Sequence, residues 1–322
     1  MNEGWTTWFQ RKIMARIHGD DKFLDFDAIG GYKTLQDTVN REMPEDFQKL
    51  VLKIGTNDPD DSYSSIAYEK GFNLLLYLER TVGTKEFEAF FQAYIAEFAY
   101  KTLTSNDFRD FFLKHFPGTQ VDWETWFYEP GMPPIVPVFD KTLSEASERL
   151  AECWVAVDRE GRMIPTTSID GWSSNQITCF LDKLQSLTQD QPLQLSTLKA
   201  MDTAYSFASS KNAEILFRYC QIEVGSEDES ILPVVLHFVM AQGRMKFTRP
   251  LYRALFASKM GRDLAIQAFV QNRDFYHPIC AKMVASDLQV DRKKVTLQPW
   301  MVVAVVAGVS AVVGTVLLRR SK

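Results

Sequence analysis

The side chains that could do chemistry near the start of this sequence lie in two short strings. The first is Asn2-Glu3-Gly4. Its carboxylate could ligate a metal, or it could occupy the start of a helix, where the helix dipole favours a negative charge. The second begins with the turn Asp58-Pro59-Asp60, after which Ser64 or Ser65 can cap a helix and place Tyr68 in its first turn. A phenol there could donate a hydrogen bond to an oxyanion, and a packing role is the alternative.

A third string, residues 242–250, carries fixed positive charge. Gly243 is expected to end one helix, and Pro250 is expected to lie in the first turn of the next. Arg244, Lys246 and Arg249 would then crowd one loop between two helices. Such a cluster could bind a carboxylate, with arginine providing a bidentate contact. A solvated basic loop is the alternative.

Helices must position these strings, because the chain up to residue 291 has the periodicity of a mainly α protein. Apolar residues recur at spacings of three and four, which is typical of helices with one buried face. The expected helices cover 5–18, 22–40, 65–82, 85–98, 105–116, 144–157, 174–187, 211–224, 229–241, 251–272 and 277–286. Residues 50–54 alone are expected to form a short strand.

A proline-rich stretch predicts a boundary. Four prolines occur from Pro130 to Pro137, so residues 132–141 are expected to form a stiff, extended linker. Residues 1–131 precede it as an aromatic-rich lobe. Residues 142–291 follow it as successive helices with short connections, which suggests a solenoid-like array.

Composition narrows the partners. The net charge is −5, which leaves no basic field to attract nucleic acid. The expected partners are therefore small molecules or other proteins. The four cysteines are widely spaced and form no CxxC pair, which indicates buried thiols in a reducing compartment such as the cytosol.

The C-terminal stretch differs from the rest, because residues 300–318 contain no charged side chain. As a helix they would extend about 28 Å, close to the thickness of a bilayer's hydrocarbon core. Basic residues flank both ends. This pattern predicts a transmembrane helix that anchors the chain by its C-terminal tail, in the endoplasmic reticulum or the mitochondrial outer membrane, with the globular part facing the cytosol. Small residues at Ala307, Ala311 and Thr315 would permit a helix-mediated dimer.

Together the three strings resemble the gluzincin zinc aminopeptidases, specifically the leukotriene A(4) hydrolase and aminopeptidase B group. The most specific matches are Tyr68-Glu69-Lys70-Gly71-Phe72 and residues 243–250, and the resemblance extends from Asn2 to about Asp291. It implies that residues 1–131 are the second half of a thermolysin-like catalytic domain. It also implies that residues 142–291 are an armadillo-type C-terminal helical domain.

The resemblance also implies roles for individual residues. Glu3 matches the third zinc ligand, and Tyr68 matches the tyrosine that stabilises the tetrahedral oxyanion. Arg244 and Lys246 match the pair that holds the carboxylate of a peptide substrate. The inner pocket is matched by Asp60 and Tyr63, which in leukotriene hydrolases help to position the epoxide chemistry. The implied activity is zinc-dependent removal of N-terminal residues from peptides, with epoxide hydrolysis as a further activity.

The HExxH motif, which supplies the other two zinc ligands and the general base, does not occur in the sequence, and no two of the four histidines are four residues apart. The chain alone is therefore expected to be inactive, as a truncated enzyme that a missing N-terminal half would complete. The alternative is a non-catalytic, membrane-tethered helical module that binds peptide C-termini through Arg244 and Lys246.

Overall fold

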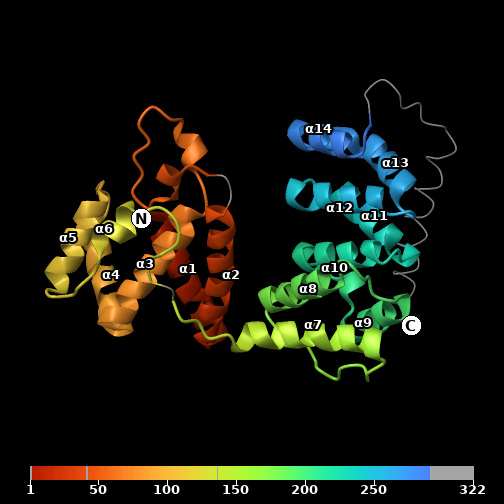
Figure 1. Ribbon diagram of the computed structural model, residues 1–322, viewed down its shortest axis with the longest axis horizontal. Coiled ribbons are helices and arrows are strands. Elements are labelled where there is room, and N and C mark those ends of the chain that lie inside the picture. The colour runs from red at the N-terminus through yellow and green to blue at the C-terminus, as the bar shows by residue number, and fades with distance from the viewer. Residues whose placement is uncertain (1, 41–42, 136, 291–322) are drawn as a thin grey trace. The chain divides into compact units, whose positions relative to one another are not determined.

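The computed structural model describes residues 2–40, 43–135 and 137–290, and the chain divides into two compact units, Met1–Leu143 and Ser144–Lys322 (Figure 1). The described residues are mainly helical and contain no strand. Residues 50–54, expected to be a strand, form a loop. Its Val51 amide donates to the Phe127 carbonyl at 2.9 Å, in place of a ladder with a partner strand.

The first unit is built around three neighbouring helices. Helix α3 (Ile66–Val82) packs against α1 (Asn2–His18) and α2 (Lys22–Val39), and α4 (Thr84–Phe98) follows it (Figure 1). Aromatic side chains from α1, α4, α5 (Ser105–His115) and α6 (Trp123–Tyr128) fill one core. The centres of five aromatic rings lie 4.9 to 6.0 Å from that of Trp5, those of Trp8, Phe87, Phe91, Tyr94 and Phe108. This core fixes α1, which carries Glu3.

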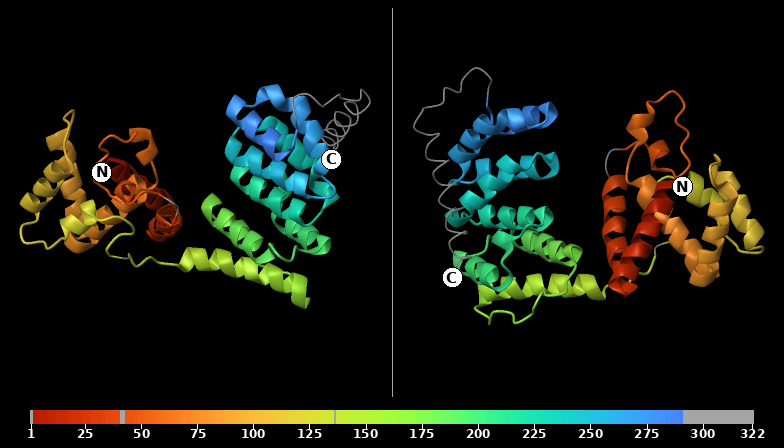
Figure 2. Two further views of the ribbon diagram at one scale, coloured as in Figure 1. Left: turned by 45° about the horizontal axis from the view of Figure 1, so that its top comes forward. Right: turned by 180° about the vertical axis from the view of Figure 1, so that it is seen from behind.

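The second unit is a two-layer stack of helices. It comprises α7 (Thr142–Glu160), α8 (Ser174–Thr188), α9 (Leu195–Tyr205), α10 (Ala213–Gly225), α11 (Leu232–Ala241), α12 (Met245–Ala257), α13 (Arg262–Asn272) and α14 (Pro278–Asp287). Helices α8, α10, α12 and α14 stack in one layer, and α11 and α13 pack in the other (Figures 1 and 2). From α8 to α14, helices of one layer thus pack against the next but one in sequence, as in α-solenoids.

Tertiary contacts decided several helix boundaries. The periodicity joined residues 251–272 into one helix, but the structure breaks it between α12 and α13. The carboxylate of Glu227, from the loop after α10, accepts hydrogen bonds from the amides of Lys259 and Met260 at 2.9 and 3.2 Å. Because the carboxylate satisfies these two amides, the helix can end here without leaving them unpaired. Helices α6 and α9 were not expected from the sequence.

Part of the stretch expected to be a linker is fastened to the first unit. Arg80 donates to the Val138 carbonyl at 2.7 Å, and the Asp140 amide donates to Asp25 at 2.8 Å. The Phe139 ring lies 5.9 Å from the Arg80 guanidinium. Residues 138–140 are therefore held by specific contacts rather than free.

The expectation of a transmembrane helix and of a membrane-anchored location is corrected. No helix among the described residues is long and apolar enough to cross a membrane. Residues 300–318, on which the expectation rested, lie outside the described residues. Their lack of charge is a property of composition alone, and it defines neither a helix nor its surroundings.

Candidate active site

Helices α1 and α3 cross where each carries a glycine, and this crossing brings the predicted site residues of the first unit together. A Cβ atom on Gly4 would lie 2.7 Å from the carbonyl carbon of Gly71, and one on Gly71 would lie 2.9 Å from the Cα atom of Gly4. The two backbones are therefore in direct contact, which only glycine permits. Glu3 precedes one glycine and Tyr68 lies one turn before the other, so both side chains start from the crossing.

Replacing Gly4 by alanine is expected to destabilise the first unit by about 1–3 kcal/mol, because the added methyl group meets backbone and not a movable side chain. The change should also move Glu3 away from Tyr68. Urea unfolding followed by amide protection in α1 and α3 measures the effect. The control is Gly30→Ala in α2, where an added Cβ meets nothing within 4 Å. Alanine should stabilise that helix by up to about 1 kcal/mol. Equal effects at the two positions would contradict the argument.

The Tyr68 hydroxyl lies between two other site residues. It shares a hydrogen bond with the hydroxyl of Tyr63, and the negative charge of the Glu3 carboxylate is close enough to raise its pKa. The hydrogen bond to Tyr63, burial and the negative charge of Glu3 together raise the pKa of Tyr68 to about 12. The phenol therefore keeps its proton at neutral pH and can act as a hydrogen-bond donor.

Local hydrogen bonds hold the segment before α3. The Asp58 carboxylate accepts from the Asp60 amide at 3.0 Å, and the Tyr63 amide donates to the Asp60 carbonyl at 3.3 Å. Asp60 is exposed, and the Tyr63 side chain is 70% exposed. These residues form an open edge beside Tyr68.

The two serines before α3 have different hydrogen-bond partners. Ser64 accepts a hydrogen bond from the Ile66 amide at 3.3 Å, whereas Ser65, the residue directly before the helix, makes no capping hydrogen bond. Ser65 instead pairs with the Thr38 hydroxyl of α2 at 2.7 Å. Tyr68 is the third residue of α3 and lies in its first turn, as expected.

A buried ion-pair network behind Tyr68 was not foreseen. Arg11 of α1 is 4% exposed and contacts both oxygens of Glu69, at 2.9 and 3.1 Å. It also pairs with Asp27 of α2 at 3.0 Å and lies 4.1 Å from the centre of the Phe72 ring. A side chain on Gly31 would collide with this pair. The signal available was Glu69, next to Tyr68 in a specific string, but nothing local identified Arg11 as its partner.

Lys70 anchors α3 from another direction. Its ammonium group is buried and donates to the carbonyls of Glu129 and Gln48 at 2.7 and 3.3 Å. Burial lowers the pKa of Lys70 to about 8. Lys70 therefore connects α3 to two other segments of the first unit, the one that contains Gln48 and the one that follows α6.

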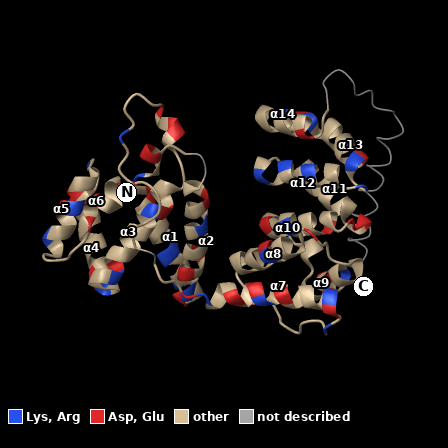
Figure 3. Cartoon of the chain, viewed as in Figure 1, with Lys and Arg blue, Asp and Glu red and all other residues tan. Residues whose placement is uncertain are grey.

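In the second unit, Arg244 and Lys246 lie at the start of α12, next to the same aromatic ring. Arg244 is the residue before the helix, and Lys246 is in its first turn. Their charged groups lie 5.6 and 5.4 Å from the centre of the Phe247 ring. The basic end of α12 lies beside the acidic start of α10 (Figure 3). The N-terminus of a helix carries partial positive charge, and Arg244 and Lys246 add to it. This end of α12 therefore attracts anions.

The other members of the expected basic cluster differ from the prediction. Pro250 lies inside α12 and not in its first turn, because the helix already starts at Met245. Arg249 turns away and pairs with Asp287 of α14 at 2.6 and 3.2 Å. It therefore joins two stacked helices.

The zinc site that the resemblance implies would include Glu3. Glu3 is half-buried beside Tyr68 and suits a ligand carboxylate. Among the described residues, however, no three side chains of His, Cys, Asp or Glu converge on a point that could hold a metal ion. The described residues therefore supply one expected zinc ligand and do not fit a complete zinc site.

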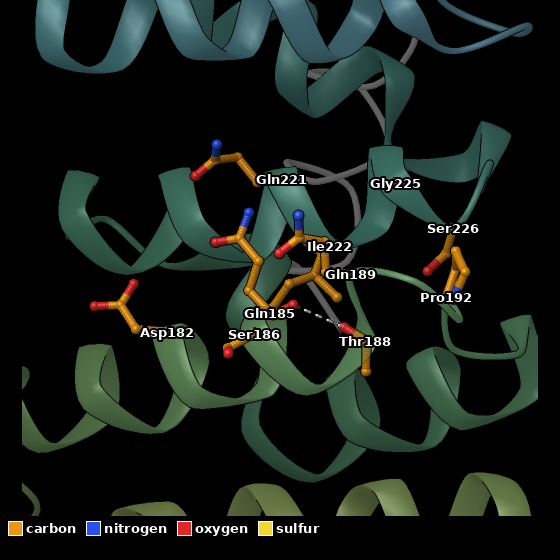
Figure 4. A pocket seen from close by; sticks show the side chains of 10 residues that line it. All are labelled: Asp182, Gln185, Ser186, Thr188, Gln189, Pro192, Gln221, Ile222, Gly225 and Ser226. Carbon is orange, nitrogen blue, oxygen red and sulfur yellow. Dashed lines mark hydrogen bonds between the residues drawn. The ribbon is translucent and has the colours of Figure 1, made fainter.

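A polar hollow in the second unit lies apart from the predicted residues. It has a volume of about 550 Å³ between α8 and α10 (Figure 4). Side-chain amides and hydroxyls line it, among them Gln185, Ser186, Gln221 and Ser226. It contains no pair of groups arranged for acid–base or nucleophilic chemistry.

Two sequence families match the chain. The peptidase family M1 domain matches residues 1–126, and the family described as leukotriene A4 hydrolase, C-terminal, matches residues 172–288. Among curated proteins, leucine aminopeptidase 2 of Ajellomyces capsulatus is 39% identical over 297 residues, which are 89% of this chain and 47% of that protein. Leucine aminopeptidase 2 of Sclerotinia sclerotiorum is 40% identical over 300 residues, 90% of this chain and 48% of that protein.

Solved structures agree with these matches. Native leukotriene A4 hydrolase from Saccharomyces cerevisiae superimposes with a TM-score of 0.80 at 33% identity, over 90% of this chain and 49% of that chain. The yeast enzyme in complex with bestatin gives a TM-score of 0.71 at 32% identity, over 90% of this chain and 50% of that one. The chain thus spans about half the length of the relatives it matches. It belongs to the M1 aminopeptidase family, in the group of leukotriene A4 hydrolase.

Proposed function

We propose that this chain contributes the Glu3–Tyr68 side of the active site of a zinc aminopeptidase of the leukotriene A4 hydrolase kind. The observation that carries the proposal is the crossing of α1 and α3, where two glycines in contact place Glu3 beside Tyr68. The network of Arg11, Glu69 and Asp27 holds both helices at this point.

Glu3 would be one zinc ligand, and the HExxH motif that would accompany it is not among the 322 residues. The proposed role of Tyr68 is that of a hydrogen-bond donor, and it follows from the phenol itself. Its phenol stays protonated, and Tyr63 shares a hydrogen bond with it. It would donate a hydrogen bond to the oxygen of the attacked carbonyl as negative charge develops there. Arg244 would bind the C-terminal carboxylate of the peptide.

The test is a chimaera in which the part of Ajellomyces capsulatus leucine aminopeptidase 2 that precedes the matched region is fused to this chain. We expect about one zinc per molecule in the chimaera and hydrolysis of alanyl anilides. The unfused chain should hold no stoichiometric zinc. In the chimaera, Tyr68→Phe should lower kcat about 100- to 1,000-fold with zinc retained, because it removes one oxyanion donor. Glu3→Gln should lose zinc.

Three results separate the parts of the proposal. Full zinc in the unfused chain would contradict the assignment of an incomplete site. Unchanged kcat in Tyr68→Phe would contradict the oxyanion role, and unchanged zinc in Glu3→Gln would contradict the ligand role. The fold of each variant is checked by amide protection in α1 and α3. Assay of the chimaera and its Asp60→Asn and Tyr63→Phe variants with a leukotriene A4 epoxide tests the further activity, for which a loss confined to the epoxide reaction is expected.

A further inference from the structure

The predicted carboxylate-binding pair is not a pair of equal cations. The Lys246 ammonium donates to both carboxylate oxygens of Glu214, at 2.6 and 2.8 Å. The Arg244 guanidinium, by contrast, has no ion pair with any residue that the structure describes, and Arg244 is exposed. A ligand therefore meets one cation that is available and one that is already engaged.

Glu214 is held in place independently of Lys246. It lies in the first turn of α10, where its charge is favourable, and its amide donates to the capping side chain of Asn212 at 3.0 Å. Arg218, one turn later, donates to its carboxylate at 2.9 Å and pairs with Asp182 of α8 at 2.6 Å. Glu214 is thus held in place within α10, and Lys246 reaches it from the neighbouring helix α12.

Glu214 is ionised at neutral pH. Burial by itself would raise its pKa, but the hydrogen bonds and positive charges of Lys246 and Arg218 outweigh burial and hold the pKa below its usual range. Two acidic and two basic side chains thus compensate one another: Asp182 pairs with Arg218, and Glu214 pairs with Lys246. Arg244 lies beside these four residues and has no ion pair with any residue that the structure describes.

We propose that Glu214 is a specificity-determining residue: by engaging Lys246 it limits the site to one carboxylate, and it disfavours peptides whose last residue is itself acidic. The inference rests on the proposed role of Arg244. A single C-terminal carboxylate is neutralised by the free guanidinium. A second carboxylate on the same residue finds Lys246 occupied and meets the negative charge of Glu214.

The experiment uses the full 322-residue chain and three tripeptides: Ala-Ala-Ala, its C-terminal amide and Ala-Ala-Asp. Affinities come from NMR titration of the arginine Nε–Hε signals. Glu214→Gln should bind Ala-Ala-Ala about three- to tenfold more tightly, leave the amide unchanged and gain most for Ala-Ala-Asp, since it frees Lys246 and removes a nearby negative charge. In the Glu214→Gln background, Lys246→Met should remove the part of the gain that comes from the freed ammonium group.

Arg244→Gln separates this inference from the proposed function. If Arg244→Gln abolishes the preference for acid over amide while Glu214→Gln changes neither affinity nor the discrimination against Ala-Ala-Asp, the Glu214 inference fails and the role of Arg244 stands. If no protein, wild type included, prefers the acid to the amide, both fail. Should Glu214→Gln not fold, Glu214→Ala takes its place with the same expected results, because it also removes the carboxylate that engages Lys246.

Discussion

Replacing Arg11 by methionine is expected to destabilise the first unit by about 3–5 kcal/mol, which is the usual cost of leaving a buried charge without its partner. Arg11 is 4% exposed and Glu69 is 13% exposed, so water cannot take over the lost contacts to Glu69. Asp27, at 30% exposed, can be hydrated more easily. The loss should therefore fall mainly on Glu69, which adjoins Tyr68.

Urea unfolding followed by amide protection in α1, α2 and α3 measures this effect. The matched control is Arg16→Met in the same helix, where the side chain is exposed and only a small change is expected. Adding Glu69→Gln to Arg11→Met should restore part of the loss, because no unpaired carboxylate is then buried. Equal destabilisation by Arg11→Met and Arg16→Met would show that the network contributes nothing beyond the helix itself.

The second large effect is expected at Glu223 of α10, which is 4% exposed. One of its carboxyl oxygens has no hydrogen-bond partner among the described residues. Burial is the main cause that raises the pKa of Glu223 to about 8; a hydrogen bond from Tyr219 lowers the pKa, and the hydrogen bond and charge of Asp228 and the charge of Asp202 raise it. The folded protein therefore holds a proton that the unfolded chain releases near pH 4.5.

The sign of the pH effect follows from this difference. Between about pH 5 and pH 8 the folded state binds more protons than the unfolded state, so stability falls as pH rises through this window. The fall approaches 1.4 kcal/mol per pH unit at most and is on the order of a few kcal/mol in total. Glu223→Gln is neutral at every pH and should remove this part of the pH dependence.

The measurement is the urea midpoint for amide protection in α10, taken at pH 5.5, 7 and 8.5. Glu223→Gln should be close to the wild type at pH 5.5 and clearly more stable at pH 8.5. The control is Glu229→Gln, which removes an exposed carboxylate from the short 3₁₀ helix that follows α10. A constant difference between Glu223→Gln and the wild type at all three pH values would rule out a proton held by Glu223.

Much of the local structure followed from the sequence, because its causes are local. Apolar spacing located most helices, since the helical repeat depends only on neighbours three and four residues away. The strings around Glu3, Tyr68 and Arg244 likewise identified the family before any contact was known.

What only the tertiary structure decided depends on which helices lie side by side. Gly4 and Gly71, Arg11 and Glu69, and Glu214 and Lys246 are each separated by 32 to 67 residues in the sequence. Spacing along one helix carries no information about such pairs. Arg244 and Lys246 are only two residues apart and both basic, yet Lys246 pairs with Glu214 of α10 while Arg244 has no ion pair among the residues that the structure describes. A charged side chain acquires its role from the partner that packing brings to it, and packing is a property of the folded chain.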